Sequence, residues 1–144
     1  MNIPFVDLHA QYLSIRPAID AAIADVIGQS SFIGGRHVTD FEAAFSRELG
    51  VKHTIGCANG TDAIYIALRM MGIGAGDEVI TTAHSWISTS EAIGQTGALP
   101  VFVDVDDCHG IDVDAIEAAI TPHTRAIIPV HLSTCSASQR ASTA

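Results

Sequence analysis

After Gly50, short apolar segments alternate with longer segments of helical periodicity, and no other feature of the sequence constrains the fold as strongly. Alternation of this kind is typical of a parallel sheet whose crossover connections are right-handed. The sequence therefore predicts an α/β fold with a partial doubly wound, mainly parallel sheet. Strands are predicted at 53–57, 78–81, 100–105 and 125–130, and helices at 61–71, 85–95 and 112–120.

The first 50 residues have helical periodicity only. Apolar residues at helical spacing from Ala10 to about Ile27 predict a helix that is either continuous or broken near Pro17. After a loop at 30–35, a second apolar stripe predicts a helix that ends at Gly50.

Composition excludes several classes of function. With 48% hydrophobic and 16% charged residues, the chain is globular and not disordered. A net charge of -9 with 7 Lys+Arg argues against nucleic acid as a partner, because a phosphate backbone requires a clustered basic face. No signal sequence or apolar run of membrane-spanning length is visible, so we expect a cytoplasmic protein without a membrane partner. The three cysteines have no paired spacing, which is typical of reduced thiols.

Ligands of such sheets bind beyond the carboxyl ends of the strands. His131 lies at that edge and is either close to the ligand or structural. The seven histidines lack the spacing of metal ligands, so no metal site is predicted. The loops to inspect are those at 58–62, 82–86, 104–107 and from 131 onward.

The first of these loops has the composition of a phosphate site. Asn59, Gly60, Thr61 and Asp62 lie between a predicted strand and a predicted helix. Backbone N–H groups and a hydroxyl at a helix N-terminus are suited to bind phosphate. An ordinary N-cap with a glycine turn is the alternative, and by itself it is the commoner of the two.

The second loop contains Trp86, the only tryptophan of the chain. An aromatic face just after a strand terminus could cover a flat heterocycle. Taken alone, a tryptophan in the core is the more frequent situation.

Several segments in the same order resemble the DegT/DnrJ/StrS family of sugar aminotransferases, which depend on pyridoxal 5'-phosphate (PLP). The opening IPFVDL at 3–8 and FIGG at 32–35 are similar to that family as well. Together with the segments below, the resemblance runs from the N-terminus to Leu132. The other segments are GTDA at 60–63, GIGAGDEVI at 72–80, GALPVFVDVD at 97–106 and IIPVHL at 127–132.

The resemblance implies that residues 1–132 form an incomplete large domain of a fold-type-I PLP-dependent transferase. The reaction would transfer an amino group from glutamate to a keto sugar attached to a nucleotide, and the intact enzyme would be a homodimer. The residues implied to bind the cofactor are Gly60, Thr61 and Asp62 at the phosphate, Trp86 against the pyridine ring and Ser85 beside it. Substrate-side residues are implied at Phe32, Ile33 and Gly34, in the loop that extends to Gly35.

The chain lacks the lysine that transamination requires to hold PLP as a Schiff base and to move protons. Its one lysine, Lys52, stands at the start of the predicted strand 53–57. At about 3.3 Å per strand residue, Lys52 would lie roughly 15–20 Å from the phosphate loop. In the family the lysine and the aspartate that faces the pyridine nitrogen come after the position of Leu132. We therefore expect no catalytic residue in this chain, and no activity.

The tail at 133–144 is small, polar and aperiodic, and we expect it to be disordered. The family would continue after Leu132 with an aromatic residue and then Gly-Gln-Pro-Ala. With a suitable choice of codons the tail contains a short tandem repeat, and deletion of one copy restores Phe-Gly-Gln-Pro. This suggests a frameshifted tail.

Two alternatives to an inactive aminotransferase fragment remain. The chain could be a truncated binding or regulatory module that keeps a weak phosphate site or pairs with a full-length relative. It could also derive from a PLP-dependent sugar dehydratase, which only residues beyond Leu132 would distinguish.

Overall fold

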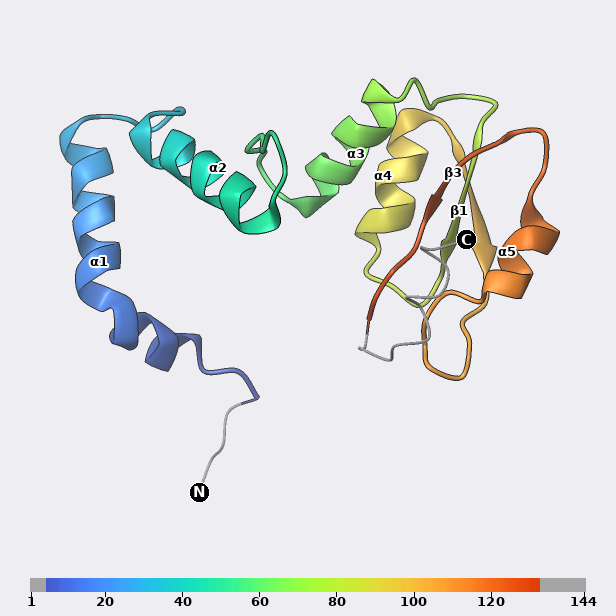
Figure 1. Cartoon of the computed structure of the whole chain (residues 1–144), viewed down its shortest axis with the longest axis horizontal. Coiled ribbons are helices and arrows are strands. Elements are labelled where there is room, and N and C mark those ends of the chain that lie inside the picture. The colour runs from blue at the N-terminus through green and yellow to red at the C-terminus, as the bar shows by residue number, and fades with distance from the viewer. Residues whose placement is uncertain (1–4, 133–144) are drawn as a thin grey trace. The chain divides into compact units, whose positions relative to one another are not determined.

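A computed structural model describes residues 5–132 of the chain (Figure 1). The chain divides into two compact units, Met1–Gly56 and Cys57–Ala144, which are described separately here. The assignment of 133–144 to a frameshifted tail falls outside the described residues, and a single domain over 1–132 stays a prediction. No helix of the described part is long and apolar enough to cross a membrane.

Helix α1 spans Leu8–Gly28 and begins at Asp7, whose carboxylate accepts a 2.8 Å bond from the N–H of Ala10. The helix is continuous through Pro17, so the predicted alternative of a helix broken near Pro17 is wrong. Proline removes one backbone bond, but Asp20 accepts hydrogen bonds from Tyr12 (2.8 Å) and Arg16 (3.1 Å), whose side chains lie on the other side of the proline. These bonds brace the helix across it.

Helix α2 spans Arg36–Leu49 and ends, as predicted, at Gly50, which has the left-handed φ of 64° that favours glycine at a helix C-terminus. Asp25 of α1 accepts hydrogen bonds from the ring of His37 (2.8 Å) and the guanidinium of Arg36 (3.0 Å). Both hydrogen bonds hold the pKa of the Asp25 carboxyl below its usual value, and the bond from His37 has the larger effect.

The second unit contains a parallel three-stranded sheet in the order β2-β1-β3. The parallel sheet predicted from the alternating pattern is thereby confirmed. Each strand is preceded or followed by a helix that crosses over the sheet. The strands are β1 Glu78–Thr82, β2 Leu99–Val103 and β3 Thr124–Ile128.

Helices cover both faces of this sheet (Figure 1). Helices α3 (Gly60–Met70) and α4 (Ser88–Thr96) pack on one face, and α5 (Val113–Ala119) packs on the other. The core on the α3 and α4 side consists of Leu68, Ile73, Val79, Ile93 and Ala98. The core on the α5 side consists of Ile80, Val103 and Ile111.

The predicted strand at 53–57 is absent. A strand requires a partner for its ladder, and this segment pairs with none of the strands β2, β1 and β3 that make up the described sheet. Ile55 is 85% exposed, so no burial of its side chain stabilises an extended conformation here. The segment therefore remains irregular within the described chain. The predicted helix at 85–95 also differs, because α4 begins only at Ser88.

Strand β3 is an edge strand of the described sheet, although a run of apolar residues such as 126–130 is typical of a strand buried on both faces. Arg125 and Ile127 are exposed, and Ile127 lies on the face of the sheet that carries Ile80 and α5. The described residues place no helix over this part of the face, so the open edge expected of an incomplete sheet is present.

Candidate functional site

The first turn of α3 has the geometry of a capped helix. Asn59 is the N-cap, and its side-chain oxygen accepts a 2.9 Å hydrogen bond from the N–H of Asp62. Its amide nitrogen also donates to the Asp62 carboxylate at 3.1 Å. The N-cap interpretation is therefore correct as geometry, and the Asp62 N–H is already occupied by a protein acceptor.

Two backbone donors remain at this helix end. The N–H groups of Gly60 and Thr61 bond to no protein acceptor within the described residues. A Cβ added at Gly60 would meet nothing within 4 Å, so the approach to these donors is open. A pair of free N–H groups at a helix N-terminus is suited to bind a phosphate. Of the three residues expected to hold the phosphate, Gly60 and Thr61 have an N–H available and Asp62 has not.

A hydrogen bond between two hydroxyl groups joins the first turns of α3 and α4. Thr61 Oγ1 donates to Ser88 Oγ at 2.8 Å, although the two residues are 27 positions apart. Ser88 is the first residue of α4, two positions after Trp86. The bond therefore brings the N-terminus of α3, with its two free N–H groups, next to the loop that carries Trp86.

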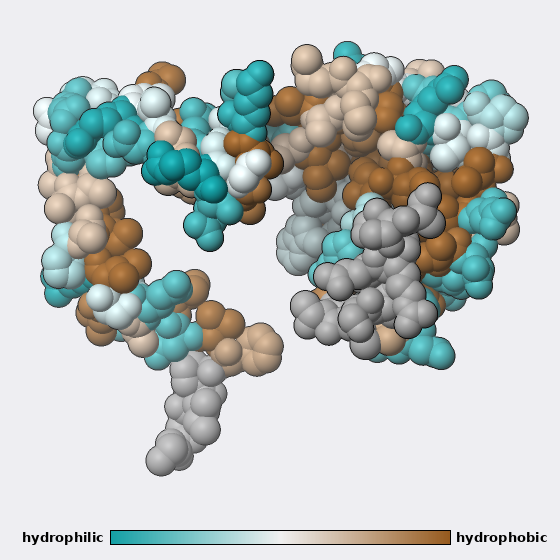
Figure 2. Space-filling view, viewed as in Figure 1, coloured by the Kyte–Doolittle hydropathy of each residue, from teal (hydrophilic) through white to brown (hydrophobic). Residues whose placement is uncertain are grey.

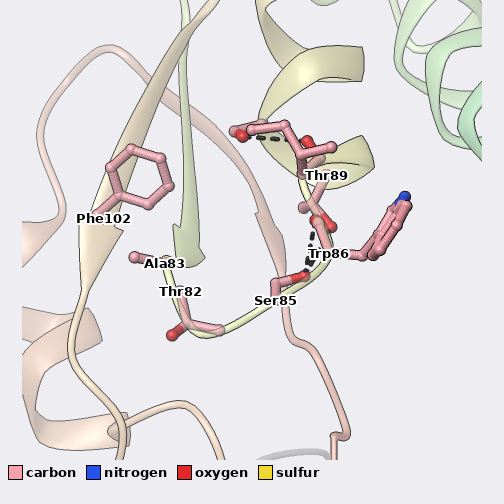
Figure 3. A pocket seen from close by; sticks show the side chains of 8 residues that line it. Thr82, Ala83, Ser85, Trp86, Thr89 and Phe102 are labelled. Carbon is pink, nitrogen blue, oxygen red and sulfur yellow. Dashed lines mark hydrogen bonds between the residues drawn. The ribbon is translucent and has the colours of Figure 1, made fainter.

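Trp86 is 77% exposed, so the alternative of a tryptophan in the core is wrong. Its loop and the end of β2 surround a hollow of about 260 Å³, and Figure 3 shows the indole ring directed away from Phe102 and Ala83. One indole face is thus free to contact a flat ligand. The hydroxyl of Ser85 is engaged, because it donates to the Trp86 carbonyl (3.1 Å) and pairs with Thr89 Oγ1 (3.3 Å).

The other predicted site residues lie elsewhere in the chain. Phe32, Ile33 and Gly34 belong to the first compact unit, where the two apolar side chains are exposed and Gly34 has a φ of 69°. Their assignment to the substrate side stays a prediction. His131 is exposed beyond the end of β3 and has an interaction partner, so its role stays open.

The sequence interpretation missed two features of this edge. The sequence placed Ser88 in a predicted helix and gave it no role in the site, because no local pattern reveals a hydroxyl pair formed across 27 positions. His84 and His109 have ring centroids 5.6 Å apart, on loops that follow β1 and β2. No group of three or more metal-ligating side chains occurs among residues 5–132.

Known proteins resemble this chain over nearly its whole length. It is 49% identical over 131 residues to the UDP-N-acetyl-3-dehydro-alpha-D-glucosamine 3-aminotransferase of Acidithiobacillus ferrooxidans, covering 90% of this chain and 36% of that protein. It is 48% identical over 133 residues to a pleiotropic regulatory protein of Geobacillus stearothermophilus, covering 92% of this chain and 36% of the relative. The chain thus spans about a third of the length of the curated relatives it matches.

Solved structures agree with the sequence comparison. The DesV protein of S. venezuelae superposes with a TM-score of 0.89 at 40% identity, over 96% of this chain and 38% of that chain. A DegT DnrJ EryC1 StrS aminotransferase from Brucella abortus superposes with a TM-score of 0.88 at 38% identity, over 97% of this chain and 40% of that chain. The fold is therefore the N-terminal part of a fold-type-I aminotransferase. Because the family profile matches residues 13–138, the chain belongs to the DegT/DnrJ/EryC1/StrS aminotransferase family.

Proposed function

We propose that this chain is the N-terminal part of a PLP-dependent aminotransferase that acts on a nucleotide-linked keto sugar, and that it is inactive without the rest of the enzyme. The observation that carries the proposal is the hydrogen bond between Thr61 and Ser88. This bond joins a helix end with free N–H groups to a loop with an exposed tryptophan. A phosphate and an adjacent flat ring are the two parts of PLP that these features suit.

The residues present fit the cofactor in part. The N–H groups of Gly60 and Thr61 would hold the phosphate, and Trp86 would lie against the pyridine ring. Asp62 would contribute its N–H only after releasing Asn59. When bound, PLP supplies an electron sink for the transfer of an amino group.

The chain's only lysine supports inactivity of the chain alone. Lys52 is exposed and belongs to the first compact unit. The predicted distance between Lys52 and the phosphate loop assumed a strand at 53–57, which is absent. The proposed inactivity therefore rests on the resemblance, which locates the cofactor lysine after the position of Leu132. Without that lysine the chain lacks the residue that would hold PLP covalently in the active site and move the substrate proton.

The substrates belong to the proposal and follow from the relatives. Two of them are named as aminotransferases of a UDP-linked and a dTDP-linked sugar, the second from Streptomyces venezuelae at 44% identity. We extend this to a nucleotide-linked keto sugar as acceptor, to glutamate as donor and to a homodimer as the intact enzyme.

A chimera tests the proposal. Residues 5–132 would replace the aligned segment of the Streptomyces venezuelae transaminase, whose remaining length would supply the part of the enzyme that has no counterpart in this chain. We expect PLP absorbance that persists through purification of the chimera, and amino transfer from glutamate. The native chain should transfer no amino group and should lose its weakly bound PLP on purification. Thr61→Val and Trp86→Ala should each weaken PLP retention in the chimera. A folded chimera that binds no PLP would contradict the proposal.

A regulatory or binding module is the second candidate, and the similarity to the regulatory protein of Geobacillus stearothermophilus favours it. Such a module would fold alone and keep phosphate affinity without the rest of an enzyme. A chain that is a stable monomer, binds PLP and gives an inactive chimera would support this second candidate. A chimera that dehydrates the sugar without amino transfer would instead indicate a dehydratase.

A further inference from the structure

The hydroxyl groups of Thr61 and Ser88 form an isolated pair at the edge of the sheet. Thr61 Oγ1 donates to Ser88 Oγ at 2.8 Å. Each residue lies in the first turn of its helix, α3 or α4, where backbone N–H groups point outward. Nearby hydroxyls are already committed, because Ser90 donates to the Ile87 carbonyl at 3.1 Å and Ser85 to the Trp86 carbonyl.

The protons of this pair determine what it can bind. A threonine hydroxyl has one proton, and that of Thr61 is directed at Ser88. The proton of Ser88 has no acceptor within residues 5–132. Thr61 can therefore donate to a bound anion only by turning its proton away from Ser88. The pair then keeps its hydrogen bond if Ser88 donates to Thr61 Oγ1.

We propose that Ser88 is a positioning residue for the cofactor phosphate. When an anion binds at the N–H groups of Gly60 and Thr61, Thr61 turns its proton to the anion and Ser88 donates to Thr61. A hydroxyl that receives a hydrogen bond is a better donor, so the chain of two bonds strengthens the contact to the phosphate. This inference rests on the proposed function and adds a residue that does not itself touch the cofactor.

The expected effect is modest and specific for phosphate. The pair keeps one hydrogen bond before and after the anion binds, so Ser88→Ala removes only the strengthening of the contact between Thr61 and the phosphate, which corresponds to about twofold weaker binding of PLP. Pyridoxal lacks the phosphate, so its binding should not change. A merely structural effect of the substitution on the Trp86 loop would weaken both ligands alike.

The test uses the full 144-residue chain and the fluorescence of Trp86, its only tryptophan. PLP and pyridoxal are titrated separately into the wild type, Ser88→Ala, Ser88→Thr and Ser90→Ala. Ser90 is the matched control, because it is a serine of the same helix turn whose hydroxyl donates to the carbonyl of Ile87, the residue before α4, and not to Thr61. The same variants in the chimera report PLP retention where the rest of the fold is present.

We expect Ser88→Ala to weaken PLP binding about twofold and leave pyridoxal binding unchanged, with Ser88→Thr restoring the affinity and Ser90→Ala having no effect. Equal loss for both ligands, or no loss, overturns the role of Ser88 while the proposed function stands. Absence of any PLP binding by both the wild-type chain and the chimera overturns the proposed function and this inference together.

Discussion

Trp86 exposes 77% of its surface on the loop after β1, although large aromatic side chains are more often mostly buried. An exposed indole contributes no core packing, so its replacement should affect ligand binding more than stability. Aromatic stacking is worth about 0.5–1.5 kcal/mol beyond the buried area. We expect Trp86→Ala to weaken PLP binding about two- to tenfold and Trp86→Phe to preserve most of it, measured by equilibrium dialysis. Equal affinity of the wild type and Trp86→Ala would contradict a stacking role.

Lys52 is the residue that decides whether a covalent adduct can form. It is exposed and lies before the segment that leads to Asn59 and Thr61. Because lysine amines react with the PLP aldehyde, borohydride reduction followed by peptide mapping should find label at Lys52 or the N-terminus only. Lys52→Arg should remove the first of these labels. Label at one site between Gly60 and Trp86 would contradict the absence of a cofactor lysine.

At the scale of elements, α3 is anchored to the sheet by Leu68, which is 2% exposed in the core with Val79 and Ile93. Leu68→Ala should lower the free energy of unfolding by about 2–5 kcal/mol, because it removes buried methyl groups and leaves a cavity. Met70 on the same helix is 82% exposed and serves as control, with an expected change within about 0.5 kcal/mol for Met70→Ala. Urea unfolding of both variants measures the difference. Similar values would contradict the assignment of Leu68 to the core.

Asp77 joins the turn before β1 to β3. Its carboxylate accepts hydrogen bonds from the N–H of Gly74 (3.0 Å) and the guanidinium of Arg125 (3.2 Å). Both contacts hold the pKa of Asp77 below its usual value, and the hydrogen bond from Gly74 has the larger effect. A carboxyl with a lowered folded-state pKa stabilises the fold above its unfolded pKa of about 4, and that contribution is lost as the pH falls further.

Asp77→Asn should therefore be less stable than the wild type near neutral pH, and the difference should shrink as the pH falls below about 4. Thermal unfolding from pH 3 to 7 measures this. Asp107→Asn is the control, because Asp107 is exposed and makes no ion pair within the described residues. A difference that grows on acidification would show that the Asp77 contacts do not act as described.

At the scale of the whole molecule, the chain exposes apolar side chains that a complete sheet would cover. Apolar (brown) surface is visible in both units in Figure 2. Neither α1 nor α2 contains a buried residue, and Ile127 is 44% exposed on the edge strand β3. Exposed apolar surface and open strand edges favour association between chains.

We expect the isolated chain to aggregate, and Ile127→Lys to reduce aggregation, because a lysine on an edge strand opposes pairing with another strand. Light scattering at several concentrations measures the effect. Arg125→Lys, on the same strand, keeps the positive charge and should not reduce aggregation. A monomeric wild type with one sharp, reversible unfolding transition would contradict this expectation and favour the regulatory module.

The sequence by itself determined the elements whose signals are local. The apolar runs of β1, β2 and β3, the left-handed end of α2 at Gly50 and the Asn59 cap of α3 depend on neighbouring residues, and all were predicted. The family was determined as well, because its motifs are short and keep their order.

Only the tertiary structure decided the features that require a distant partner. Segment 53–57 has strand composition but pairs with none of the described strands β1, β2 and β3. Local composition also could not determine that Trp86 is exposed, that Ile127 lies at an open edge or that Ser88 meets Thr61. The physical reason is common to these cases: burial, strand pairing and hydrogen bonds across 27 positions depend on how helices and strands pack together.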